Sequence, residues 1–145
     1  MIDRVVSRWH EFLSSKDPAV LDELLDEDVV FYSPVVFTPQ RGKRLTMLYL
    51  LAAGEALPGA NDDDDRPGMP RSFRYTKEVL GSDTAVLEFE TSIGDTYVNG
   101  VDIIRANEQG RIVEFRVLVR PLQAMTAVHQ QMAATLERMG ALPPS

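Results

Sequence analysis

Hydrophobic residues recur every three or four positions in the first thirteen residues of the chain. This spacing gathers side chains on one helix face and predicts an amphipathic helix of about three turns. The positions are Ile2, Val5, Val6, Trp9, Phe12 and Leu13. Asp17-Pro18 then predicts the start of a second, short helix, because Asp supplies an N-cap oxygen and Pro already has the φ angle of the first helical turn.

One strand and two further helices are indicated by patterns of the same kind. Residues 29–37 are β-branched and aromatic, and Pro34 among them predicts a strand end or an edge, because proline has no amide hydrogen to donate. Gly42 precedes a third, largely apolar helix. A proline opens the C-terminal helix predicted at 121–139. Its inward stripe is expected to be Leu122, Met125, His129, Met132, Leu136 and Met139.

After Phe73 the period of the pattern changes to two, which predicts β-strands. Four such segments follow one another with short turns between them, as expected for sequential antiparallel strands. Gly94-Asp95 suits a two-residue hairpin loop, and Gly110 suits a left-handed turn position. One face of these strands is apolar. The order of elements predicts an α+β fold in which helices cover one side of a curved antiparallel sheet.

Residues 58–72 interrupt the pattern with three prolines, two glycines and a run of aspartates, which predicts a long flexible loop. The run does not fit a calcium-binding EF-hand loop, which needs Gly at position 6 and Glu at position 12. Counted from Asp62, those positions hold Pro67 and Phe73. With 145 residues the chain is long enough for one core, so we expect a single domain over residues 1–145.

The composition of the chain argues against several kinds of binding partner. The formal net charge is −7, so a phosphate backbone would be repelled and nucleic acid is not an expected partner. The chain has no cysteine and two histidines, and it contains no phosphate-binding or metal-binding motif, so we expect no metal and no cofactor. No apolar run approaches the roughly 20 residues that cross a bilayer, so no membrane partner is expected. Lack of cysteine makes a cytoplasmic location the default expectation.

Asp102 stands between Val101 and Ile103 in an otherwise apolar strand. It shares strand parity with Val98 and Ile104, so it should face the helices rather than solvent. Burying a charged carboxyl group costs free energy, so Asp102 is a candidate for a specific role at this buried position.

Three segments carry a resemblance to a known family. They are Asp17-Pro18 through LLDEDVVFYSP, the segment after Gly42, and GVDIIRANEQGRIVEF. In this order they resemble the nuclear transport factor 2-like superfamily, the cone-shaped fold of ketosteroid isomerases, scytalone dehydratase, polyketide cyclases and limonene epoxide hydrolase. The resemblance covers nearly the whole chain. It implies that the helices close over the concave face of the sheet and leave an apolar pocket with a few polar groups.

Placed against ketosteroid isomerases, Asp102 matches the carboxyl that stays protonated and helps to form the oxyanion hole. The isomerase itself is the established example of an apolar site that raises a carboxyl pKa and turns the group into a hydrogen-bond donor. The alternative is an Asp that is bonded to neighbouring groups as a satisfied polar residue. The other isomerase positions do not match, because the helix-one tyrosine falls at Trp9 and the general-base aspartate falls at Ser33. Steroid-type isomerisation is therefore not expected.

The remaining candidate binding residues are Trp9, Ser33, Tyr49, Phe89 and Phe115. Each aromatic ring among them lines either a pocket or a dry core, and Tyr49 has the option of pointing its hydroxyl into the pocket. His129 is expected to pack in the fold or at an interface. His10 is expected to face away from Trp9.

Two classes of function remain open. The first is a pocket protein that binds a small apolar molecule, with or without lyase- or isomerase-type chemistry, so the sequence leaves open whether the chain is an enzyme. The alternative is a non-enzymatic dimeric binding or protein-interaction module. A third reading is a domain that stabilises a larger assembly. Apolar Val101, Ile103, Ile112 and Leu118 are expected on the outer sheet face, which predicts a homodimer through that face.

Overall fold

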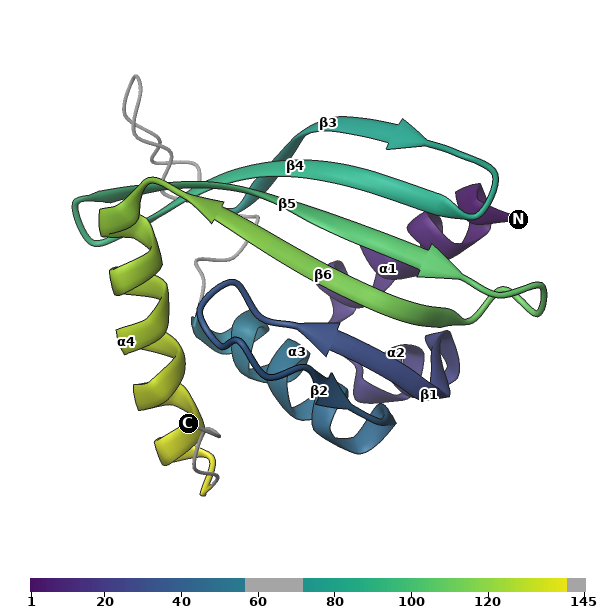
Figure 1. Cartoon of the computed structure of the whole chain (residues 1–145), viewed down its shortest axis with the longest axis horizontal. Coiled ribbons are helices and arrows are strands. Elements are labelled where there is room, and N and C mark those ends of the chain that lie inside the picture. Colours follow the sequence, from purple (N-terminus) through teal and green to yellow (C-terminus); the bar gives the residue numbers. More distant parts are fainter. Residues whose placement is uncertain (57–71, 141–145) are drawn as a thin grey trace.

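The computed structural model describes residues 1–56 and 72–140 of the chain, and within them it confirms the predicted α+β class (Figure 1). The loop predicted at 58–72 lies outside the described residues except for Ser72. The helices are α1 (Ile2–Ser15), α2 (Pro18–Leu24), α3 (Lys43–Ala56) and α4 (Leu122–Arg138). The strands are β1 (Leu25–Tyr32), β2 (Gln40–Arg41), β3 (Arg74–Leu80), β4 (Thr84–Ile93), β5 (Thr96–Ala106) and β6 (Ile112–Arg120).

The strands form one sheet in the order β2-β1-β6-β5-β4-β3. As predicted, β3 to β6 are sequential antiparallel neighbours, and Gly94-Asp95 closes the β4–β5 hairpin with Gly94 at φ 60°. The sheet is mostly antiparallel, as predicted, with one exception: β1 runs parallel to β6. The long connection from β1 through α3 to the meander allows this, since parallel neighbours need a crossover rather than a tight turn. The first strand also begins earlier than predicted and ends before Pro34.

The helices α1, α2 and α3 lie on one face of the curved sheet, and α4 crosses its end (Figure 1). The predicted stripe of α1 is buried from Ile2 to Phe12, and Asp17 caps α2 by accepting a hydrogen bond from the Ala19 amide at 3.0 Å. A fully buried Leu, Ile or Phe contributes about 1.5–3 kcal/mol, so this shared core holds helices and sheet together. Among the described residues, no helix combines the length and apolar content needed to cross a membrane.

The buried face of α4 matches the predicted stripe only in part. Leu136 is buried and Met132 packs against the core, as predicted. Leu122 is 74% exposed and His129 is also exposed, whereas Ala124 and Thr135, which the prediction left out, are buried. Ala124 belongs to a small core cluster with residues of β4 and β5, so a small side chain brings the start of the helix against the sheet. Helical spacing alone does not identify this face, because α4 has apolar residues on more than one side.

Two β-bulges shift the strand register. In β6, Val113 is the extra residue between the pairs Arg105–Glu114 and Ala106–Ile112. Ile112 therefore faces the core and has no exposed surface, so the prediction that it belongs to the outer sheet face is wrong. In β3, Thr76 is the extra residue. An uninterrupted register would have set Thr76 opposite Phe89, but the bulge places Tyr75 there instead, on the inner face.

Candidate functional site

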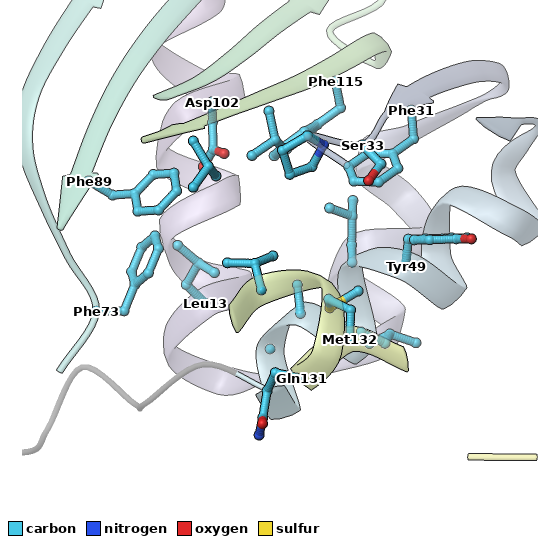
Figure 2. Close-up of a pocket in the computed structure, with 18 of the residues that line it drawn as sticks. Leu13, Phe31, Ser33, Tyr49, Phe73, Phe89, Asp102, Phe115, Gln131 and Met132 are labelled. Atoms are coloured by element: carbon cyan, nitrogen blue, oxygen red, sulfur yellow. The ribbon is translucent and has the colours of Figure 1, made fainter. Parts of the chain in front are cut away.

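A cavity of about 1060 Å³ lies between the inner face of the sheet and helices α1, α3 and α4. Its volume is at the upper end of the range typical of small-molecule sites. Figure 2 shows how side chains from the strands and the helices surround it. The residues proposed from sequence all border this cavity: Trp9, Ser33, Tyr49, Phe89, Asp102 and Phe115.

Aromatic rings form two sides of the cavity. On one side Phe115 packs against Trp9 at 4.9 Å between ring centroids and against Phe31 at 6.0 Å. On the other side Phe89 stacks on Phe73, with centroids 4.9 Å apart and planes 27° from parallel. The sequence left open whether these rings line a cavity or a dry core, and the geometry places them at the cavity wall.

A chain of hydrogen bonds joins α1, β3 and β5 at the wall of the cavity. The indole Nε1 of Trp9 donates to the hydroxyl oxygen of Tyr75 at 2.8 Å. The Tyr75 hydroxyl in turn donates to Oδ2 of Asp102 at 2.5 Å. Trp9 is thus both a wall of the cavity and a polar anchor, because its N–H fixes the orientation of the tyrosine that contacts the acid.

Burial controls the ionisation of this network. Asp102 is 6% exposed, and desolvation raises its pKa from 3.8 to about 7, although the hydrogen bond from Tyr75 works in the opposite direction. Burial also raises the pKa of Tyr75 well above its usual value, and the neighbouring Asp102 carboxyl adds to this effect. The aspartate is therefore the member of the pair that titrates near neutral pH, while Tyr75 keeps its proton.

One oxygen of Asp102 remains available to a ligand. Tyr75 occupies Oδ2, and Oδ1 has no hydrogen-bond partner within residues 1–56 and 72–140. Figure 2 shows the carboxyl group directed from β5 into the cavity, between Phe89 and Phe115. Below its pKa this oxygen can donate a hydrogen bond to a ligand, and above its pKa it can only accept one.

Ser33 and Tyr49 border the cavity at the opposite side from Phe89 (Figure 2). The Ser33 hydroxyl accepts a hydrogen bond from the Val35 amide at 3.2 Å, so it is held by its own turn. The Tyr49 hydroxyl is buried without a partner among the described groups, and burial raises its pKa. Figure 2 shows this hydroxyl on the side of the ring away from Asp102, so Tyr49 offers its ring rather than its hydroxyl to the cavity.

The prediction that His10 faces away from Trp9 is wrong, because both side chains contact Tyr75. The imidazole of His10 packs edge-on against the Tyr75 ring, with centroids 5.5 Å apart, and its Nε2 lies 2.5 Å from Oε1 of Glu78. Both side chains border the cavity and are about two-fifths exposed. The helical position after Trp9 turns by only 100°, which keeps His10 close to the buried stripe rather than opposite to it.

Tyr75 and Glu78 are the site residues that sequence reasoning missed. The strand pattern at Arg74–Leu80 was recognisable, but a regular alternation places Tyr75 on the outer face. The available signal was the pair Phe73 and Tyr75, two aromatic residues at period two, next to the edge of an apolar sheet face. In the part of the chain that the structure describes, no three His, Cys, Asp or Glu side chains gather in a position to hold a metal ion.

Known structures share the overall fold. A steroid delta-isomerase from Pseudomonas aeruginosa is 27% identical, with a TM-score of 0.80 over 94% of this chain and 92% of the other. A Silicibacter pomeroyi protein with a cystatin-like fold is 26% identical, with a TM-score of 0.76 over 92% of this chain and 85% of the other. The chain has the fold of the nuclear transport factor 2-like superfamily. A SnoaL-like polyketide cyclase homologue from Shewanella denitrificans is 16% identical, with a TM-score of 0.59 over 94% of this chain and 96% of the other.

That last likeness shows the fold alone. No protein-family model matches the sequence, and no curated protein matches it either. The shared fold accounts for the curved sheet and the helices that close over it, whereas the chemistry must be argued from the side chains at the cavity.

Proposed function

We propose that this chain binds a small, mainly apolar molecule with a carbonyl or hydroxyl oxygen, and that Asp102 holds this oxygen. The observation that carries the proposal is the arrangement of the Asp102 carboxyl. One of its oxygens is fixed by Tyr75, and the other is free and directed into an aromatic cavity. A preorganised donor in a water-poor cavity binds a ligand oxygen without having to reorganise.

The same geometry limits the chemistry of the site. A protonated Asp102 polarises a carbonyl group by donating to its oxygen, as an acid in an apolar pocket can. The similarity to a steroid delta-isomerase supports an apolar, oxygen-bearing ligand. Ser33 stands where the resemblance would require a carboxylate base, and its hydroxyl is bonded to a backbone amide. Asp102 therefore binds and polarises a ketone, and neither Asp102 nor Ser33 supplies the base of a double-bond isomerisation.

Binding of 2-acetylnaphthalene, followed by its fluorescence, tests this proposal. A ketone oxygen only accepts hydrogen bonds, so its affinity should fall as the pH rises through about 7, where Asp102 loses its proton. Asp102→Ala should weaken binding about tenfold at pH 6, the equivalent of one buried hydrogen bond. Asp102→Asn keeps a donor that does not ionise, so its affinity should not change between pH 6 and pH 8.

Two controls make the result specific to the hydrogen bond. Naphthalene has the same rings without the oxygen and should bind with an affinity that does not depend on pH. Asp95→Ala removes a carboxyl in the exposed β4–β5 turn and should leave binding of the ketone unchanged. Binding of the ketone that ignores both pH and Asp102→Ala would contradict the proposal.

A further inference from the structure

His10 and Glu78 form an acid–imidazole pair at the cavity wall, next to the hydrogen-bond chain but not part of it. The pair joins α1 to β3, with 2.5 Å between Nε2 of His10 and Oε1 of Glu78. In the neutral form of the imidazole, the contact of Nε2 with a carboxylate favours the tautomer that carries its proton on Nε2 and its lone pair on Nδ1. Among the described residues, Nδ1 has no hydrogen-bond partner.

The pair and Asp102 contact the same tyrosine. The imidazole of His10 packs on the Tyr75 ring in a T-shaped contact at 79°, and the hydroxyl of that ring reaches Asp102. His10, Tyr75 and Asp102 all border the same cavity. A ligand whose oxygen is bonded to Asp102 can therefore extend along the Tyr75 ring toward the imidazole.

We propose that His10, oriented by Glu78, is a general base of this cavity and removes a proton from an activated carbon acid whose oxygen is held by Asp102. This inference rests on the proposed function, because Asp102 must first bind the oxygen. In the step, the C–H bond breaks and its proton moves to Nδ1 of His10. The electron pair forms a carbon–carbon double bond, and the carbonyl π electrons move to the oxygen, where the hydrogen bond from Asp102 stabilises the negative charge.

The two residues of the pair have different roles. His10 is the catalytic residue, because its Nδ1 would contact the substrate proton. Glu78 is a positioning residue that fixes the tautomer and the orientation of the ring, as carboxylates do for catalytic imidazoles. An imidazole is a weak base, so the substrate class is a carbon acid with an activating neighbour rather than a simple ketone.

The ring opening of 5-nitrobenzisoxazole tests this proposal without knowledge of the natural substrate. A base removes the proton on the ring carbon, the C–H electrons form a nitrile, and the N–O bond breaks to release a coloured phenolate oxygen. The wild-type chain should open the ring with saturation kinetics and faster than an equal concentration of free imidazole. His10→Ala should lower kcat about a hundredfold or more, the usual contribution of a general base, with little change in KM.

His129 provides a matched control, because its imidazole also borders the cavity, from α4, but has no carboxylate partner among the described residues to orient it. His129→Ala should leave the rate unchanged. Glu78→Gln keeps the size of the side chain but removes its charge, and should lower kcat without changing the circular dichroism spectrum. Free imidazole added to His10→Ala should restore part of the rate, which a purely structural role of His10 would not allow.

Three results would overturn the proposal: a wild-type rate no higher than that of free imidazole, an unchanged rate in His10→Ala, or an equal loss in His129→Ala. The binding of 2-acetylnaphthalene distinguishes a failure of His10 as a base from a failure of the proposed binding function. Ketone binding that depends on Asp102, together with no ring opening, would leave the binding function in place and remove only the base.

Discussion

Asp102 links the candidate site to the stability of the whole chain. Its pKa is about 7 in the folded protein and near the ordinary value of 3.8 when the chain is unfolded. The folded state therefore binds a proton more tightly than the unfolded state. The contribution of Asp102 to stability is fully present below pH 3.8 and is lost as the pH rises through about 7.

We expect Asp102→Asn to remove this pH dependence, because asparagine resembles the protonated acid and does not ionise. Between pH 5 and pH 8 the free energy of unfolding of the variant should rise by about 3 kcal/mol relative to that of the wild type. Urea unfolding at the two pH values measures this difference, and other titrating groups cancel in it. A difference that stays constant with pH would show that Asp102 titrates as an exposed carboxyl does.

At the scale of the elements, β5 has room for no side chain at the position that lies against the aromatic wall of the cavity. Gly100 lies opposite Phe89 in the sheet. A Cβ atom at this position would collide with the Phe89 ring and lie 2.5 Å from the Leu118 carbonyl oxygen. Glycine is therefore required here for close approach, since the ring that stacks on Phe73 occupies the space of a side chain.

Gly100→Ala should lower the free energy of unfolding by about 1–3 kcal/mol, the usual cost of overpacking a core. The same change should disturb the Phe89 and Phe73 wall of the cavity. Gly54→Ala is the matched control, because nothing lies within 4 Å of a Cβ there and the residue is helical. It should raise stability by up to about 1 kcal/mol. Equal effects of the two variants in urea unfolding would contradict the close approach at Gly100.

At the scale of the molecule, the outer face of the sheet carries exposed apolar side chains. Val79 is 55% exposed and Leu118 is 49% exposed, and half-buried Val86, Val101 and Ile103 lie between them. Ion pairs such as Arg105–Glu114 surround these residues. An apolar strip with a charged border is typical of an interface between copies of a chain. We therefore still predict a homodimer, with this outer sheet face as its interface.

Light scattering at micromolar concentration should give twice the mass of the 16.2 kDa chain. Leu118→Glu should reduce this to the mass of a single chain, because it places a charge inside the predicted interface. Leu122→Glu changes a residue that is 74% exposed on α4 and should leave the dimer intact. A wild-type protein with the mass of one chain would contradict the prediction.

The sequence by itself determined the types of the elements and most of their order. Periods of 3.6 and 2 report directly which side chains must be buried together, so α1, the β3–β6 meander and the hairpin at Gly94-Asp95 were predictable. The inward position of Asp102 followed from strand parity in the same way. The neighbour of β1 did not follow, because a strand pattern carries no information on which strand lies beside it.

Only the tertiary structure decided which residues meet at the site. The bulge at Thr76 turns Tyr75 inward, and the contact between α1 and β3 brings His10 to Glu78, which is 68 positions away in the sequence. The bulge in β6 likewise moves Ile112 from the expected outer face into the core. A bulge shifts the alternation of inward and outward side chains by one residue, and it leaves too small a trace in the hydrophobic pattern to be recognised. The local sequence therefore predicts the strand, whereas tertiary packing decides which face of the sheet each side chain occupies.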